Sequence, residues 1–199
     1  MCRVLSRSVL AALALLLTAA CGSAAPAKES AHEYTARQSI CAALPLDVLT
    51  DPLGDPDEKP VPTSGEVENA PQGRCRASYW GKDTSPYAKS RVFVYVTYLP
   101  GPADARSRYA SQLGNDPTFA VGGKVSEVKG VGQAAYRYRN TVGSGTPRPQ
   151  LELIAQDGNA LIEVIVHAGL QQTPDEKTLT ALEDRTAVFA DGALKALRA

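Results

Sequence analysis

Alternating apolar and polar positions predict a β-hairpin in the last third of the chain. Residues 151–156 and 159–167 flank Asp157-Gly158, a pair typical of a two-residue hairpin turn. One face of this hairpin is apolar, which predicts a core: Leu151, Leu153, Ala155, Ala160, Ile162, Val164 and Val166. The opposite face mixes both kinds of residue: Glu152, Ile154, Leu161, Glu163, Ile165 and His167. With Asp157-Gly158 as the turn, Glu152 lies opposite Glu163.

Other segments have strand or helix patterns. Segments rich in β-branched and aromatic residues predict three more strands, at 75–80, 91–99 and 134–139. Helices are predicted over 41–49, over 103–113 and from an N-cap at Thr173 onward. The last is long, with one apolar stripe: Leu179, Leu182, Thr186, Phe189, Ala193 and Leu197. We therefore predict an α+β fold, an antiparallel sheet of about five strands with the helices packed on one face.

Residues 51–74 interrupt this pattern. They contain five prolines, several glycines and six acidic residues, which predicts a long acidic surface loop. Long loops often carry function, so this loop is a candidate binding element.

The N-terminus has the pattern of an export signal. Arg3 and Arg7 precede an apolar run of about 12 residues, too short for the roughly 20 that span a bilayer. The segment around Cys21, Leu-Thr-Ala-Ala-Cys-Gly-Ser, resembles a bacterial lipobox. That resemblance implies cleavage before Cys21 and lipid attached to its sulfur; an ordinary signal peptide is the alternative. We expect a signal peptide at 1–20, a flexible tether at 21–37 and a single domain at 38–199, anchored at the cell membrane and facing outward.

Charge and cysteine count narrow the picture further. Lys+Arg and Asp+Glu both number 21; removal of Arg3 and Arg7 leaves 19 basic against 21 acidic residues, a net charge of −2. This balance argues against nucleic acid as a partner, because binding it requires clustered basic residues. Cys2 leaves with the signal and Cys21 carries lipid, so Cys41 and Cys75 remain, an even pair that predicts a disulfide in an exported chain.

Residues suited to catalysis are scarce. No nucleophile-elbow motif is present, and His167 is the one histidine in the expected domain. Glu152 and Glu163 could form an acid pair as in glycosidases, but we favour a solvated face with ion pairs to Arg137 and Arg139, which uses the same residues and needs no chemistry. We therefore expect no enzyme, no cofactor and no metal; a hydrolase is the alternative.

A combination of short motifs resembles a known family. The lipobox is followed by Cys-Ala-Ala-Leu at 41–44, by Cys75 opening a strand that ends in Tyr79-Trp80, and by Gly-Val-Gly at 130–132. The chain is similar in these respects to actinobacterial lipoproteins grouped as a domain of unknown function. The resemblance implies a disulfide-bonded α+β domain outside the membrane and no known catalytic residue.

Two functions follow as expectations. The first is a membrane-anchored binding or accessory module that recognises a protein or cell-envelope ligand through the acidic loop or the mixed hairpin face: Ile154, Leu161, Glu163, Ile165 and His167. The second is a carrier that holds an apolar, lipid-like ligand in a cavity between sheet and helices, lined by residues such as Tyr95, Tyr136 and Phe189.

Overall fold

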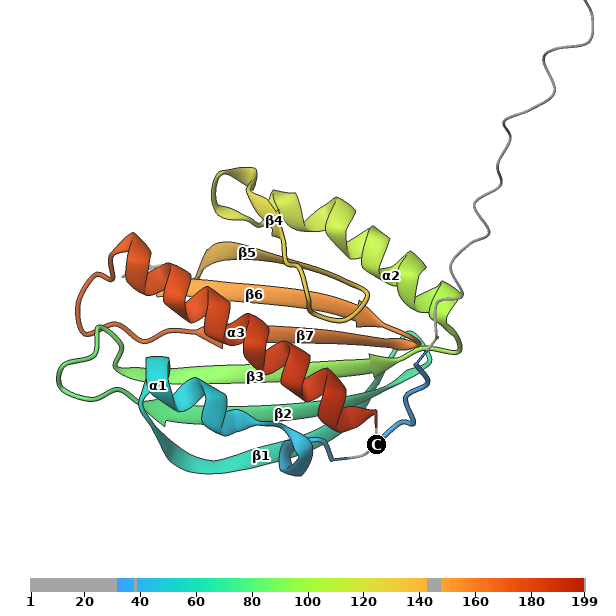
Figure 1. The fold of residues 1–199 in the computed structure, drawn as a ribbon, viewed down its shortest axis with the longest axis horizontal. Helices are drawn as coiled ribbons and strands as arrows, with labels where there is room; N and C mark the ends of the chain where they lie inside the picture. Colours follow the sequence, from blue (N-terminus) through green and yellow to red (C-terminus); the bar gives the residue numbers. More distant parts are fainter. Residues whose placement is uncertain (1–31, 38, 143–147, 199) are drawn as a thin grey trace, which may run out of the picture. The chain divides into compact units, whose positions relative to one another are not determined.

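The computed structural model describes residues 32–37, 39–142 and 148–198. Within these residues, seven antiparallel strands form a single sheet (Figure 1). The strand order across the sheet is β1-β2-β3-β7-β6-β5-β4. Their bounds are β1 Asp55–Val67, β2 Ala70–Trp80, β3 Lys89–Tyr98, β4 Val125–Glu127, β5 Ala134–Val142, β6 Arg148–Asp157 and β7 Ala160–His167. The antiparallel sheet is confirmed, but the predicted number of about five strands is wrong.

The long edge strand β1 occupies the segment that was expected to be an acidic loop. It pairs with β2, and Glu68 and Asn69 join the two strands in a turn where both have positive φ. Prolines do not prevent this, because β1 is an edge strand and an edge strand needs only part of its N–H groups for pairing. The prediction of a loop from the proline-rich, acidic composition is therefore wrong, because pairing with β2 holds this segment as a strand.

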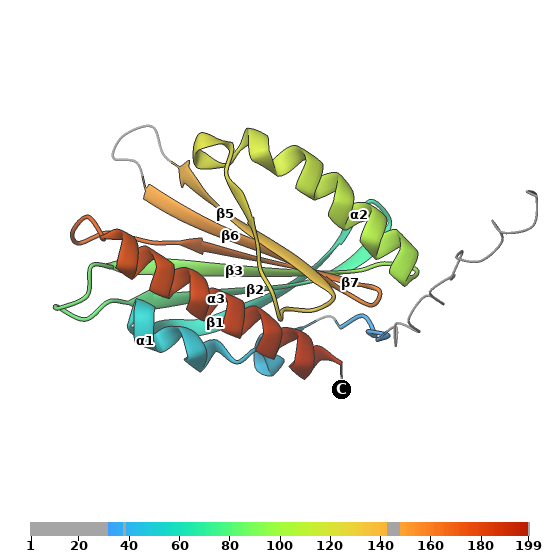
Figure 2. The ribbon, with the colours of Figure 1, turned by 45° about the horizontal axis from the view of Figure 1, so that its top comes forward.

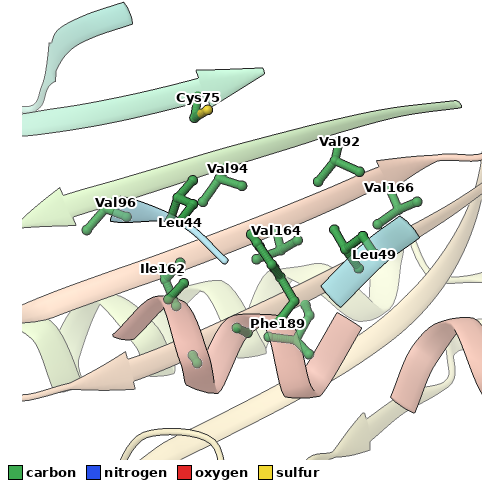
Figure 3. Close-up of a cluster of buried hydrophobic side chains, with 14 of the residues drawn as sticks. Leu44, Leu49, Cys75, Val92, Val94, Val96, Ile162, Val164, Val166 and Phe189 are labelled. Atoms are coloured by element: carbon green, nitrogen blue, oxygen red, sulfur yellow. The ribbon is translucent and has the colours of Figure 1, made fainter. Parts of the chain in front are cut away.

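One side of the sheet, the front face, carries the main core. The long helix α3 (Glu176–Leu197) crosses it, beside the short helices η1 (Cys41–Ala43), η2 (Leu46–Leu49) and α1 (Thr50–Leu53) (Figures 1 and 2). Phe189 of α3 packs among the valines of β3 and β7 (Figure 3) and is fully buried. The predicted core face of the β6–β7 hairpin is confirmed, since each of its residues is at most 5% exposed.

Helix α3 begins two residues later than the sequence pattern indicates. Asp175 is its N-cap, and Oδ1 accepts a hydrogen bond from the Thr178 backbone N–H at 2.7 Å. The aspartate side chain therefore caps the helix where Thr173 was expected to do so. The apolar stripe is confirmed from Leu182 to Leu197.

The back face of the sheet carries a helix as well, which corrects the expectation that all helices lie on one face. Helix α2 (Pro102–Asn115) contacts β6 and β7, and the ring of Tyr109 packs edge-on against Tyr136 at 5.2 Å between centroids. Ile154 and Leu161 are buried in this second cluster. Two short helices, η3 (Asp116–Thr118) and η4 (Val121–Gly123), lead from α2 to β4. The back of β5–β7 is apolar enough to require a cover, and α2 supplies it.

The β6–β7 hairpin has a different register from the predicted one. Asp157 pairs with Ala160, so Gly158 and Asn159 form the turn, and Glu152 lies opposite Ile165 instead of Glu163. Gly158 has φ +53°, and a Cβ there would lie 1.6 Å from the His32 carbonyl oxygen. The glycine is therefore placed where residues 32–34 press against the turn.

Covalent and polar links fasten the N-terminal segment to this fold. Cys41 and Cys75 form the predicted disulfide, with Cα atoms 5.2 Å apart. Tyr34 is 4% exposed although it belongs to the expected tether. Cys21 and residues 1–20 lie outside the described residues. Among the described residues, no helix combines the length and apolarity needed to cross a membrane.

Candidate functional site

The back of β2, β3 and β7 forms the candidate site, because α2 lies against β6 and β7 and leaves this part partly exposed. Directly opposed residues share a face, so pairing gives three rows across the strands. The rows are Ser78–Arg91–His167, Arg76–Phe93–Ile165 and Arg74–Tyr95–Glu163. We call these nine residues, with Trp80 at the end of β2, the open face.

Aromatic and apolar side chains form the middle of the open face. The rings of Phe93 and His167 contact each other at 5.1 Å between centroids, tilted by 58°. Phe93, Tyr95 and Ile165 are all half-buried, and Trp80 is 57% exposed. An exposed tryptophan beside half-buried rings is typical of a binding surface. Contact of its apolar ring with water is unfavourable, and burial against a ligand would remove that unfavourable contact.

Three arginines, on β2 and β3, make part of the open face basic. The guanidinium of Arg74 lies 5.8 Å from the centroid of the Tyr95 ring, and its Nε donates to Gln72 at 2.6 Å. Arg76 and Arg91 are exposed, and neither has a hydrogen bond or ion pair of its side chain within the part of the chain that the structure describes. Two charged groups are thus available to a ligand.

The opposite corner of the open face is acidic. Glu163 is half-buried and lacks an ion-pair partner among the described residues. Burial, followed by the nearby carboxylates of Glu152 and Asp116, raises the pKa of Glu163 to about 7, while Arg108 opposes the shift. Glu152, which is 7% exposed, accepts a 2.5 Å hydrogen bond from the Tyr138 hydroxyl and another from the Gln150 amide.

Asp116 at the end of α2 completes this acidic corner. Its Oδ2 accepts a 2.5 Å hydrogen bond from the Tyr136 hydroxyl. Burial raises the pKa of Asp116, and the hydrogen bond from Tyr136 partly opposes this. Hydroxyl and amide donors thus stabilise the carboxylates of Glu152 and Asp116.

His167 is placed for packing. Burial and the charge of Arg91 both lower the pKa of His167, which favours the neutral imidazole. Its ring contacts Phe93, and no carboxylate hydrogen bond orients either ring nitrogen within the described residues. A general base needs such an orienting partner or a nearby nucleophile, so the geometry favours a packing role.

The structure divides the residues of the predicted binding face. Glu163, Ile165 and His167 belong to the open face, whereas Ile154 and Leu161 are 1% and 4% exposed beneath α2. The three apolar residues therefore do not form one exposed patch. Whether the remaining residues bind a ligand stays a prediction.

The arginines expected beside the glutamates lie on the other face. Arg139 Nε binds Glu183 at 2.5 Å, and Arg137 binds Glu183 at 3.2 Å, so both reach α3 on the front. Their place beside Glu152 is taken by Tyr136 and Tyr138, because the strand alternation in β5 assigns tyrosines to the back and arginines to the front.

The residues proposed for a carrier cavity do not meet. Phe189 is in the front core and Tyr136 in the back cluster, so the sheet separates them. A cavity between α3 and β6–β7 measures only about 20 Å³. A cleft of about 530 Å³ lies instead on the α2 side, lined by residues that include Tyr109, Leu113, Val125 and Tyr136.

The basic and aromatic part of the open face was not predicted from the sequence. Arg76 lies in the predicted strand 75–80, and Arg74 directly precedes that strand. Arg76, Ser78 and Trp80 occupy alternate positions along it. The sequence does not indicate that β2 pairs with β3, nor that β7 completes the three rows of the open face. Pairing between strands that are distant in the sequence leaves no local signal.

Comparison with known proteins adds two weak likenesses of fold. No protein-family model matches the chain, and no curated protein does. The extracellular domain of PknH from Mycobacterium tuberculosis aligns with 14% identity and a TM-score of 0.45, over 82% of this chain and 99% of that one. TTHA0849 from Thermus thermophilus aligns with 12% identity and a TM-score of 0.23, over 77% and 80%. Neither likeness carries an argument about function.

Proposed function

We propose that the chain is an extracytoplasmic lipoprotein, anchored through lipid on Cys21, that acts as a non-enzymatic binding module of the cell envelope. The observation that carries the proposal is the open face, where a half-exposed sheet surface combines aromatic rings with two unpaired arginines, within the part of the chain that is described. Anchoring rests on the lipobox-like sequence alone.

The attachment point favours an open face that is accessible in the anchored protein. Tyr34 lies at the β6–β7 turn, where its backbone N–H donates to the Asn159 side chain, and 12 residues separate it from Cys21 in the sequence. The strand β7 runs from that turn at Asn159 to His167, roughly 26 Å away at 3.3 Å per residue. Trp80 and Arg91 therefore belong to the end of the sheet remote from Tyr34 and the β6–β7 turn.

A binding role fits the chemistry of the site better than catalysis. His167 packs against Phe93, and Cys41 and Cys75 are bonded to each other. Glu152 and Glu163 are not directly opposed, and the donors around Glu152 are a tyrosine and a glutamine. These groups can position a ligand but lack an activated nucleophile.

The α2 cleft favours a second candidate function, the carrier of an apolar ligand. Its volume of about 530 Å³ is within the range of small-molecule sites, and its lining includes two tyrosines and several valines. The carrier function would place the ligand between α2 and the β4–β5 hairpin, on the back of the sheet.

Site-directed photo-crosslinking on intact cells tests the binding module. A photoreactive amino acid at position 93 reports on the open face, and one at Val188, which is 54% exposed on α3, serves as the control on the front. We expect covalent adducts from position 93 and none from position 188. Equal labelling at both positions, or none at position 93, would contradict the proposed function.

Membrane fractionation tests the anchor separately. We expect wild-type protein in the membrane fraction and Cys21→Ala protein released from it at high salt. If Cys21→Ala protein stays with the membrane, the lipid on Cys21 is not the anchor.

A further inference from the structure

The positive charges of the open face are divided between two neighbouring strands. Arg74 and Arg76 alternate on β2, and Arg91 follows on β3, diagonal to Arg76. Residues two apart on one strand are about 6.6 Å apart, so the three side chains are attached over roughly 13 Å along the two strands. Arg76 and Arg91 lack ion-pair partners within the described part of the chain.

The aromatic rings are divided between the same two strands. Phe93 and Tyr95 on β3 lie beside Arg76 and Arg74, whereas Trp80 lies on β2, two residues past Ser78. Lys89, opposite Trp80, is already paired with Asp57 at 2.6 Å. Strand β2 thus carries two arginines and one ring, and β3 carries two rings and one arginine. Glu163 limits this surface on the β7 side.

The backbone of this surface is closed to a ligand. Strands β2 and β3 pair with neighbours on both sides, so their N–H and C=O groups are used within the sheet. A peptide bound as an added strand needs a free sheet edge, and the open face offers none among the strands described. A ligand must be recognised by side chains alone, through negative charges on arginine and flat apolar faces on rings.

We propose that the open face binds a linear anionic polysaccharide, whose acidic groups pair with Arg76 and Arg91 and whose sugar rings stack on Trp80 and Phe93. This inference rests on the proposed binding function and names its ligand class. Regularly spaced carboxylates or phosphates match arginines spaced along two neighbouring strands, and sugar rings present apolar C–H faces to aromatic side chains. A folded acidic protein is the alternative partner that the experiment separates.

Binding of the full chain in detergent to polygalacturonate tests the inference, with neutral dextran and poly-glutamate as comparison polymers. The variants are Arg76→Gln/Arg91→Gln and Trp80→Ala. Arg185→Gln is the matched control, since Arg185 is a half-exposed arginine paired with Asp51 on the front side of the molecule. Thermal melting of each variant verifies folding.

We expect polygalacturonate to bind with an affinity that falls as salt rises, and dextran not to bind. The double arginine variant should bind at least about tenfold more weakly and Trp80→Ala at least about fivefold, whereas Arg185→Gln should match wild type. Equal binding of poly-glutamate, unaffected by Trp80→Ala, overturns the polysaccharide and indicates an acidic protein. Absence of polygalacturonate binding also overturns it, while adducts from position 93 on cells would leave the binding module standing.

Discussion

The Tyr34 hydroxyl donates a 2.5 Å hydrogen bond to Oδ2 of Asp157, joining residues 123 positions apart in the sequence. The same oxygen accepts from the Arg198 guanidinium at 2.7 Å, and His32 Nδ1 lies 3.2 Å from it. Asp157 is 1% exposed, so this carboxylate fixes the start of the domain, its last helix and the β6–β7 turn at one buried point.

Replacing Asp157 with Asn should destabilise the domain by about 2–4 kcal/mol. Asparagine keeps the shape but removes the charge that balances the Arg198 guanidinium, and breaking a buried ion pair leaves the partner uncompensated. Urea unfolding measured by circular dichroism gives the free energy of unfolding. Asp191→Asn, which loses an exposed i,i+4 pair with Lys195, is the control and should cost less than about 0.5 kcal/mol. Equal stability of the two variants would show that the buried pair is not needed.

The raised pKa of Glu163 predicts stability that falls as pH rises. The folded-state pKa is about 7, above the usual 4.5, so the folded domain holds this proton more tightly than the unfolded chain. The contribution is fully present below pH 4.5 and is lost between pH 4.5 and 7. Glu163→Gln keeps a neutral group at every pH and should therefore gain about 2 kcal/mol relative to wild type between pH 5 and pH 8.

Unfolding at both pH values, with the difference between variant and wild type compared, checks this. The exposed Glu66, changed to Gln, is the control and should show no such pH dependence. A Glu163→Gln difference that does not change with pH would mean that water or a nearby cation solvates the carboxylate in the folded domain.

Glu183 should be the most important acidic residue of α3 for stability. It is 9% exposed and binds Arg139 and Arg137 of β5. Glu183→Gln leaves two half-buried guanidinium groups without their shared carboxylate, and we expect a loss of about 1–3 kcal/mol. Asp184→Asn removes the 3.0 Å contact of a 67% exposed aspartate with Arg137 and should cost less than about 0.5 kcal/mol by thermal melting. A larger loss of stability for Asp184→Asn than for Glu183→Gln would show that Asp184 makes the more important contact between α3 and β5.

Removing the Cys41–Cys75 disulfide should cost about 3–4 kcal/mol. The bond closes a loop with a sequence separation of 34, and the stabilisation follows from the restricted unfolded chain. Urea unfolding of the Cys41→Ala/Cys75→Ala variant measures the loss. Thiol labelling of the denatured, unreduced protein should detect neither cysteine; labelling of either one would show that the bond is absent.

Local patterns predicted the elements whose burial depends on their own alternation. The core face of β6 and β7 could be predicted because Ile162 and Val164 alternate with Glu163 and Ile165 along the strand. The observed pairing differs from the predicted one by a shift of two residues, which leaves every side chain on the same face. The register itself could not, because the buried carboxylate of Asp157 contacts Tyr34 and Arg198, which are distant in the sequence. Strand β1 was missed for a related reason, because its many exposed and proline residues form a strand only against β2.

The candidate site shows the same division. Ile154 and Leu161 look like an exposed patch in the sequence, and only the placement of α2 on the back face buries them. Arg76 and Phe93 have no sequence relationship, and the β2–β3 pairing makes them neighbours. The sequence by itself determined the export-like N-terminus and the apolar faces, because each depends on residues close together in the chain. It also determined the cysteine pair, because only Cys41 and Cys75 remain once Cys2 and Cys21 are assigned to the N-terminal signal and the lipid. Only the tertiary structure decided which faces remain open, because cover and cross-strand rows depend on contacts between distant segments.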